Sequence, residues 1–210
     1  MSLVGVISVL VVIVFSMMLH ELAHGGVAYL LGDTTAKDDG RLTLNPLKHL
    51  DPVMSVILPL ASFLMGGVVF GGAKPVPVNT RHLKGGVWGM VAVALAGPLT
   101  NFVLAFIGFL IWEGAGAVDL NTFLGTTVVN LVFVNLGFGV FNLIPIPPLD
   151  GSRILYAIAP DGAREFMDKM EKYGIFIVYI LILVGGNVFS SVMTGAMNGI
   201  LQGYYWIIGR

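Results

Sequence analysis

The sequence contains no cysteine, which excludes a disulfide framework, an iron–sulfur cluster and a thiol nucleophile. Charged residues are also scarce: they make up 11% of the 210 residues, against roughly 25% in an ordinary soluble domain. The formal net charge is −1 and no cluster of Lys and Arg occurs, so a nucleic acid is not expected as a partner. Hydrophobic residues, in contrast, make up 56% of the chain. This composition predicts a protein whose solvent is the lipid bilayer.

Four apolar segments are long enough to form transmembrane helices: residues 3–31, 87–111, 123–144 and 174–192. The first has no basic residue before Lys37, so it lacks the charged start of a cleavable signal peptide and is expected to stay in the membrane. A further apolar run, residues 53–70, is about the minimum spanning length and is interrupted by Pro59 and by Gly66-Gly67. The sequence therefore predicts an all-α polytopic membrane protein with four firm transmembrane helices and one interrupted segment.

The basic residues indicate how the interrupted segment lies. Ten of the eleven Lys and Arg residues occur in three connections, residues 32–52, 71–86 and 145–173. All three connections fall on one face of the membrane if the segment from about 51 to 79 re-enters and returns, and on both faces if it crosses. The positive-inside rule favours re-entry, with the N-terminus outside the cell membrane and the basic connections in the cytoplasm. The Pro and Gly residues of this segment suit short extended or β pieces rather than a continuous helix.

His20-Glu21-Leu22-Ala23-His24 is the most informative stretch. On a helix, positions i and i+4 share a face, so two imidazoles can bind one metal ion with Glu21 beside it, as in the H-E-x-x-H arrangement of zinc proteases. In such sites the metal acidifies a water molecule and the glutamate accepts its proton. The competing interpretation is a structural His–Glu–His hydrogen-bond cluster. Three ionisable groups within one turn of a membrane helix are costly, however, unless a ligand compensates them.

Catalytic zinc usually has three protein ligands, so a third must come from elsewhere in the chain. His49 and His82 lie in the basic connections and are expected to be solvated loop residues. Asp150 is the better candidate, because prolines at positions 145, 147 and 148 break the preceding helix just before it. By itself Asp150 would be interpreted as the N-cap of a helix; the H-E-x-x-H motif shifts the balance toward a metal ligand.

Three stretches together resemble the site-2 proteases, a family of intramembrane zinc metalloproteases: residues 20–24, Ala96-Gly97-Pro98-Leu99-Thr100-Asn101, and residues 142–151. The resemblance implies one Zn²⁺ per chain held by His20, His24 and Asp150, with Glu21 as the catalytic base. It also implies that Asn142 lies near the reacting carbonyl. From its position alone Asn142 is a buried amide, for which an oxyanion donor and a helix–helix hydrogen bond are equally open.

The resemblance is to the small branch of the family that lacks PDZ and CBS modules, because the longest polar connection, residues 145–173, has fewer than thirty residues. We expect a single membrane-embedded domain over residues 1–210, with a catalytic core at about 3–151 and C-terminal helices at about 152–210. Asn101 is expected to bond between helices rather than to touch substrate. Gly195, Gly199 and Gly203 form either a close-packing helix face for a homo-oligomer or a glycine-rich tail without specific contacts.

The function implied is hydrolysis of peptide bonds in transmembrane or membrane-associated protein segments, as regulated intramembrane proteolysis or as clearance of signal peptides and anchors. An exposed strand edge could pair with such an unwound substrate. Residues 40–44, with alternating apolar and polar side chains, are the candidate edge, with the re-entrant segment or an ordinary loop as alternatives. Residues 74–78 are extended but lose two N–H donors to proline, so they suit a rim better than a ladder.

The alternative function is a transmembrane divalent-metal transporter that uses the His/Glu cluster as an ion site. A transporter needs a relay of polar residues through several helices. Residues 87–111 and 174–192 contain no Asp, Glu, His, Lys or Arg, so the sequence favours the protease.

Overall fold

The computed structural model describes residues 3–51, 74–115, 119 and 122–210. Helices dominate this part of the chain and no strand occurs in it, which confirms the predicted all-α class. In chain order the elements are α1 (Leu3–Leu30), α2 (Thr35–Asp38), the 3-10 helix η1 (Pro46–Lys48), α4 (Gly86–Gly114), α5 (Phe123–Asn142), α6 (Gly151–Ile158), α7 (Asp161–Glu171) and α8 (Gly174–Ile207).

Four of these helices, α1, α4, α5 and α8, are long and apolar enough to cross a membrane, as predicted. Their ends lie close to the predicted ones except in α8, which continues to Ile207 rather than ending near residue 192. Gly186 kinks α8, because its φ of 41° and ψ of −117° are not helical values. The part of α8 after the kink is about 30 Å long, enough to cross the hydrocarbon core, whereas the part before it is not.

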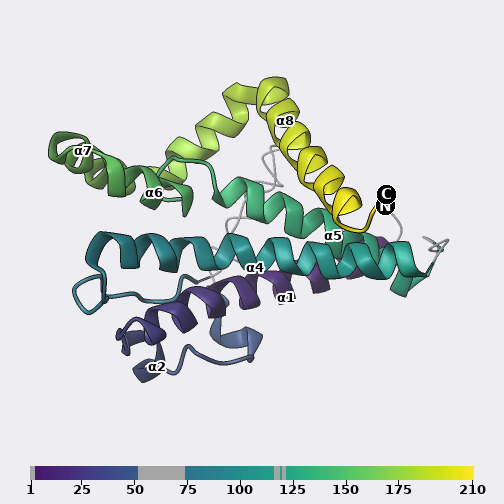
Figure 1. Cartoon of the computed structure of the whole chain (residues 1–210), viewed down its shortest axis with the longest axis horizontal. Helices are drawn as coiled ribbons and strands as arrows, with labels where there is room; N and C mark the ends of the chain where they lie inside the picture. The colour runs from purple at the N-terminus through teal and green to yellow at the C-terminus, as the bar shows by residue number, and fades with distance from the viewer. Residues whose placement is uncertain (1–2, 52–73, 116–118, 120–121) are drawn as a thin grey trace.

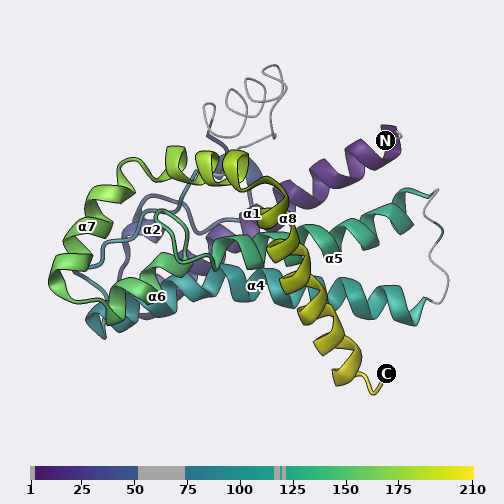
Figure 2. The same ribbon diagram turned by 90° about the horizontal axis from the view of Figure 1, so that it is seen from above.

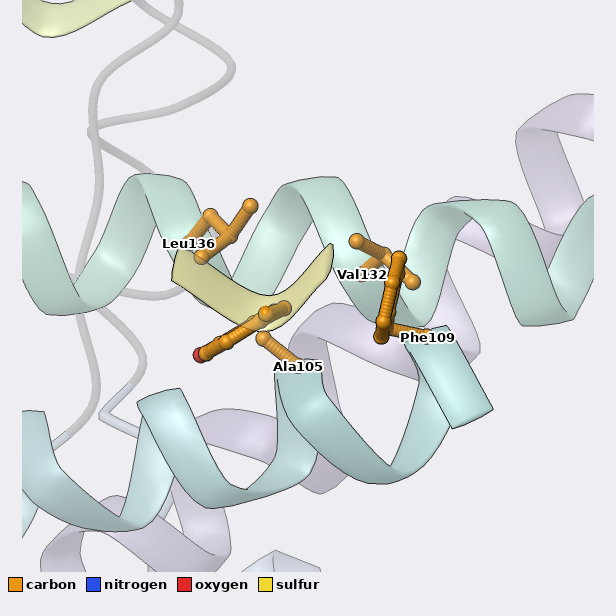
Figure 3. Close-up of a cluster of buried hydrophobic side chains, with 5 residues drawn as sticks. Ala105, Phe109, Val132 and Leu136 are labelled. Carbon is orange, nitrogen blue, oxygen red and sulfur yellow. The ribbon is translucent and has the colours of Figure 1, made fainter. Parts of the chain in front are cut away.

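Helices α1, α4 and α5 lie side by side along the long axis of the molecule (Figure 1). The second part of α8 lies obliquely across α4 and α5 (Figure 2). Ala105 and Phe109 of α4 meet Val132 and Leu136 of α5 in a buried apolar cluster (Figure 3), to which α8 contributes Tyr204. The Tyr204 hydroxyl donates a hydrogen bond of 2.7 Å to the carbonyl oxygen of Phe102, so this polar tip is satisfied within the bundle.

The chain leaves α1 and enters α4 at the same end of the bundle. The N–H of Lys84 donates to the carbonyl oxygen of Leu31 at 2.8 Å, and Ala28, Leu83 and Val93 form a buried cluster there. The connection between these helices therefore makes no net crossing, while its re-entry into the membrane stays a prediction. The greater part of the predicted re-entrant segment, residues 52–73, lies outside the described residues.

Most basic residues gather at this end, where α2, α6 and α7 also lie (Figure 1). Arg210 lies at the opposite end and forms an ion pair with Glu113 at the end of α4. The basic residues are therefore segregated in the folded bundle as they are along the sequence, with Arg210 at the end opposite the basic connections.

Residues 40–44 do not form the candidate strand edge but the alternative, a loop. Its backbone groups are used in local turns: the N–H of Gly40 donates to Lys37, that of Arg41 to Ala36, and that of Thr43 to Arg41. The side chain of Thr43 also accepts from the N–H of Asn45. Because these groups are committed within a few residues, they leave no row of free donors and acceptors along a sheet edge.

The absence of cysteine makes the arrangement of the ends testable with single cysteines. Lys37→Cys and Arg81→Cys should react with a membrane-impermeant maleimide from the same side of sealed vesicles, because the segments that carry them are joined by hydrogen bonds near the end of α1. Arg210→Cys should react from the other side. Labelling of positions 37 and 81 from opposite sides would contradict the fold.

Candidate metal centre

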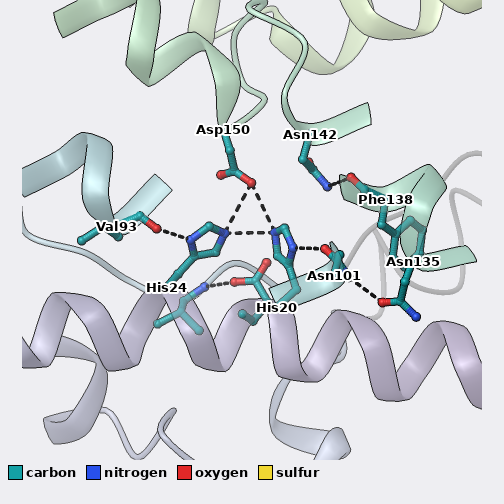
Figure 4. A network of polar contacts seen from close by, with 10 residues as sticks. His20, His24, Val93, Asn101, Asn135, Phe138, Asn142 and Asp150 are labelled. Atoms are coloured by element: carbon teal, nitrogen blue, oxygen red, sulfur yellow. Dashed lines mark hydrogen bonds and ion pairs between the residues drawn. The ribbon is translucent and has the colours of Figure 1, made fainter. Parts of the chain in front are cut away.

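His20 and His24 project from one face of α1 into the bundle, where both are buried. They lie one turn apart, as the motif requires, and their Nε2 atoms are 3.0 Å apart (Figure 4). The two rings meet edge to face with centroids separated by 4.6 Å. Two nitrogens of the same type therefore converge on one point beside a predominantly apolar helix.

Asp150 reaches the same point from the connection between α5 and α6. Its Oδ2 lies 3.3 Å from His20 Nε2 and 3.4 Å from His24 Nε2. Among the described residues these three form a group whose ligand atoms all lie within 4.8 Å of one another.

The hydrogen bonds on the far side of each ring decide which nitrogen carries the proton. His24 Nδ1 lies 2.7 Å from the carbonyl oxygen of Val93, which can only accept, so Nδ1 carries the hydrogen. His20 Nδ1 lies 2.6 Å from Asn101 Oδ1 and donates in the same way. In the neutral rings both Nε2 atoms are then acceptors, and they face a carboxylate oxygen.

A cation fits this set of atoms. Asp150 Oδ2 is buried and makes no hydrogen bond among the described residues, and the neighbouring Nε2 lone pairs offer it no proton. Three acceptors without a donor repel one another, and burial makes that repulsion expensive. Two imidazole nitrogens and one carboxylate oxygen are the donors expected of a catalytic zinc site that keeps one position open.

A relay of amides supports His20. Asn101 of α4 donates from Nδ2 to Asn135 Oδ1 of α5 at 2.8 Å, and Asn135 donates to Ser16 Oγ of α1 at 2.8 Å. All three side chains are fully buried. The relay therefore returns to the helix from which it started and links α1, α4 and α5 to one ligand. Asn101 bonds between helices, as expected from the sequence.

Sequence reasoning missed Asn135 and Ser16, although one signal was present. Both are polar residues within long apolar helices, where an unpaired polar group is costly, so each needed a partner inside the bundle. The sequence could not show that the partners were each other, because 119 positions separate them.

Gly97 leaves space beside the two histidines. A Cβ atom at this position would lie 2.5 Å from His20 Cε1, 2.5 Å from His24 Nε2 and 2.6 Å from His20 Nε2. No side chain can be added there without displacing a ligand nitrogen. Gly97 belongs to the stretch of α4 that contributed to the resemblance, and this contact gives it a physical role.

Glu21 lies beside the group of three ligands but is not part of it. Its Oε2 accepts a hydrogen bond of 2.7 Å from the N–H of Val76. Asn142, at the end of α5, donates from Nδ2 to the carbonyl oxygen of Phe138 in its own helix at 3.0 Å and lies on the side of the site from which Asp150 enters (Figure 4). This bond lies within one helix rather than between helices. A role for Asn142 at the reacting carbonyl stays a prediction.

The two remaining histidines lie outside the group. His49 is buried and its Nε2 lies 2.9 Å from the carbonyl oxygen of Thr43. His82 is exposed and its Nδ1 lies 3.5 Å from Asp33 Oδ1. The expectation that His49 is solvated is therefore wrong, because its ring supports the connection after α1.

Known proteins place this site in a family context. Residues 117–185 match the family model described as Peptidase family M50. YwhC of Bacillus subtilis, named as a candidate zinc metalloprotease, is 39% identical over 201 residues, which cover 91% of this chain and 88% of YwhC. Rip2 of Mycolicibacterium smegmatis, named in the same way, is 34% identical over 87% of this chain and 70% of its own length. Zinc metalloprotease MJ0392 of Methanocaldococcus jannaschii is 29% identical over 85% of this chain and 43% of its own length. No solved structure matches this chain.

The space beside Gly97 predicts a strong effect of a single methyl group. Gly97→Ala should lower zinc affinity by at least about 100-fold, because the Cβ displaces ligand nitrogens directly, whereas losing an outer contact costs about 10–100-fold. Gly26→Ala, on α1 with no atom within 4 Å of the added Cβ, is the matched control. Competition with a chelator measures the affinity. Equal affinity in the two variants would show that the metal does not lie at this point.

The relay predicts a smaller effect. Asn101→Leu removes the acceptor that orients His20 and should lower zinc affinity by about 10–100-fold. The control is Asn130→Leu, which removes another amide between α5 and α1, bonded to Ser8 at 2.9 Å, without touching a ligand. The same chelator titration compares them, and circular dichroism checks that both variants keep their helices. Equal losses in both would mean that Asn101 acts through packing alone.

Proposed function

The chain belongs to peptidase family M50, the site-2 proteases, and from that premise we propose that it cleaves transmembrane or membrane-anchored segments of other proteins within the bilayer. It is a membrane zinc metalloprotease and a metalloendopeptidase. The observation that supports the proposal is the convergence of His20, His24 and Asp150 between membrane-crossing helices, with Glu21 beside them. A site between membrane-crossing helices suits a substrate segment that itself lies in the membrane.

His20, His24 and Asp150 would hold one Zn²⁺ per chain. When bound, the ion supplies a Lewis acid that polarises a carbonyl group and acidifies water. Glu21 accepts the proton of the attacking water and returns it to the leaving amine. Asn101 and the Val93 carbonyl keep the Nε2 atom of each histidine free to act as a ligand by holding the proton on Nδ1.

Asn142 can contribute as a donor without losing its present bond. Its amide nitrogen carries two hydrogens, and one of them is used on the Phe138 carbonyl oxygen. The other is available for the carbonyl oxygen of a substrate, where negative charge develops during attack. This role needs a donor close to Asp150, and Asn142 lies on that side of the site (Figure 4).

The depth of the site agrees with a membrane substrate. His24 precedes the end of α1 by six residues, which corresponds to about 9 Å of helix. The basic residues gather beyond that end, so the positive-inside rule places it in the cytoplasm, with the N-terminus outside the cell membrane. The reaction would then serve regulated intramembrane proteolysis or the removal of signal peptides and membrane anchors.

Two further expectations belong to this proposal. The chain would act as one membrane-embedded domain, supported by the packing of Tyr204 from α8 against α4 and α5. A homo-oligomer through Gly195, Gly199 and Gly203 stays a prediction. A Cβ atom added at any of these positions would have no other atom of the described chain within 4 Å, so the chain itself does not fill this helix face.

The proposed reaction is tested by Glu21→Gln in purified protein with a helical membrane substrate. The variant keeps all three ligands, so zinc should stay bound, while cleavage should fall by about 10²–10⁴-fold because the proton acceptor is lost. Glu165→Gln, an exposed change on α7, is the control. Undiminished cleavage by Glu21→Gln would refute the assignment. Metal transport into vesicles without any proteolysis would favour the transporter instead.

A further inference from the structure

Residues 74–79, here called the strap, have no regular secondary structure and lie beside the C-terminal half of α1. The strap is held by its backbone: the N–H of Lys74 donates to the His49 carbonyl oxygen at 2.8 Å, and the N–H of Asn79 donates to Asp33 Oδ2 at 2.6 Å. Between these two bonds, the N–H of Val76 donates to Glu21 Oε2 at 2.7 Å. The strap therefore joins the connection after α1 to the glutamate of the site.

The sequence of the strap isolates this one donor. Pro75 and Pro77 have no backbone N–H, so the N–H of Val76 is the single amide donor over residues 75–77. Proline also fixes φ on both sides of Val76, which limits the directions in which its N–H can point. The two prolines make this segment a poor sheet edge. The same prolines suit it to present one donor, the Val76 N–H, to one acceptor.

Arg41 sets the position of the strap. Its side chain is buried, with 7% of its surface exposed, and its Nη2 donates to the Lys74 carbonyl oxygen at 2.7 Å and reaches the Pro75 carbonyl oxygen at 3.4 Å. Burying a guanidinium is costly. Among the described residues its hydrogen bonds go from Nη2 to the two carbonyls that precede the Val76 N–H, and its Nε has no partner there. Arg41 is one of the basic residues on which the predicted topology rests, but it lies inside the protein.

Asp33 holds the other end of the strap. Its carboxylate is fully buried and accepts from the N–H and hydroxyl of Thr35 as well as from Asn79. Burial opposes ionisation, but these donors and His82 hold the pKa of Asp33 below its ordinary value. The bond to Asn79 is therefore a charge-assisted one at neutral pH.

The strap is also packed tightly against α1. A Cβ at Gly25, the residue after His24, would lie 2.9 Å from Val76 Cγ1 and 2.7 Å from Leu42 Cδ2. Val76 itself is buried. A larger residue at position 25 would push the strap away. Gly25, which directly follows the H-E-x-x-H motif, therefore allows the strap to approach α1 closely.

We propose that Arg41 is a positioning residue for Glu21: it holds the strap so that the Val76 N–H fixes one carboxylate oxygen and leaves the other to accept a proton. Oε1 of Glu21 makes no hydrogen bond among the described residues, whereas Oε2 is engaged. A glutamate side chain has several rotatable bonds. Anchoring Oε2 restricts these bonds and keeps Oε1 in the orientations from which it can accept the proton of the attacking water. The inference rests on the proposed function for its catalytic consequence, but the contact itself does not.

Hydrogen exchange of the Val76 amide tests the contact without any substrate. Pro75 and Pro77 carry no N–H, so this is the one exchangeable backbone amide over residues 75–77, and NMR of the zinc-loaded protein follows its exchange. Arg41→Met and Glu21→Leu should each speed its exchange by about tenfold or more, because a charge-assisted hydrogen bond is lost. Glu21→Gln keeps an acceptor oxygen and should protect the amide better than Glu21→Leu. Arg81→Met, at an exposed arginine, is the matched control and should leave exchange unchanged.

Steady-state kinetics test the consequence. Arg41→Met should lower kcat by about tenfold or more, with KM within about twofold and zinc content unchanged, because a misplaced base slows the reaction rather than substrate binding. Arg41→Lys keeps a donor for the Lys74 carbonyl and should recover part of kcat. A merely structural role would lower zinc content and kcat together and would not be rescued by lysine.

Unchanged Val76 exchange in Arg41→Met, or a rise in KM with kcat unaltered, would overturn the inference. If Arg41→Met does not fold, the Glu21 pair decides: equal exchange of Val76 in Glu21→Leu and Glu21→Gln would overturn it as well. Failure of the proposed function has a different signature, since the wild-type protein would then protect Val76 but cleave no membrane substrate.

Discussion

The structure depends on one electrostatic constraint, which is that three acceptor atoms face one another in a site shielded from water. The Nε2 atoms of His20 and His24 and one oxygen of Asp150 all lie within 4.8 Å of one another. No donor among the described residues lies between them, so the arrangement is stable when a cation balances it. The rest of the bundle can be understood as the set of contacts that bring these atoms together and keep their lone pairs directed at the same point.

Each transmembrane helix around the site supplies a different part of that support. Helix α1 carries both imidazoles, and α4 provides the two acceptors on their far sides together with the space at Gly97. Helix α5 anchors the relay through Asn135, and its early end allows the chain to turn and bring Asp150 back into the bundle. Because these contacts connect different helices, the ligand geometry and the packing of the bundle cannot vary independently.

The connection after α1 has a second task besides joining helices. Its charged residues look alike in a count of basic and acidic side chains, yet they behave differently in the fold. Lys37 is exposed, whereas Arg41 and Asp33 are buried and bonded to the strap. The same positive charge that helps to orient a membrane protein can therefore also serve as a structural donor next to the site.

The sequence by itself determined the elements and the chemistry that depend on local spacing. Long apolar runs specify the four spanning helices, and His20 and His24 share a face because an α-helix repeats every 3.6 residues. The prolines before Asp150 break α5 for an equally local reason. Tertiary structure decided what depends on distant partners: the relay through Asn135, the hold of Arg41 on the strap, and local turns in place of a strand at residues 40–44. Periodicity tells which face of a helix is apolar, but not which buried polar group will meet which other, because that choice is made by the packing of segments far apart in the chain.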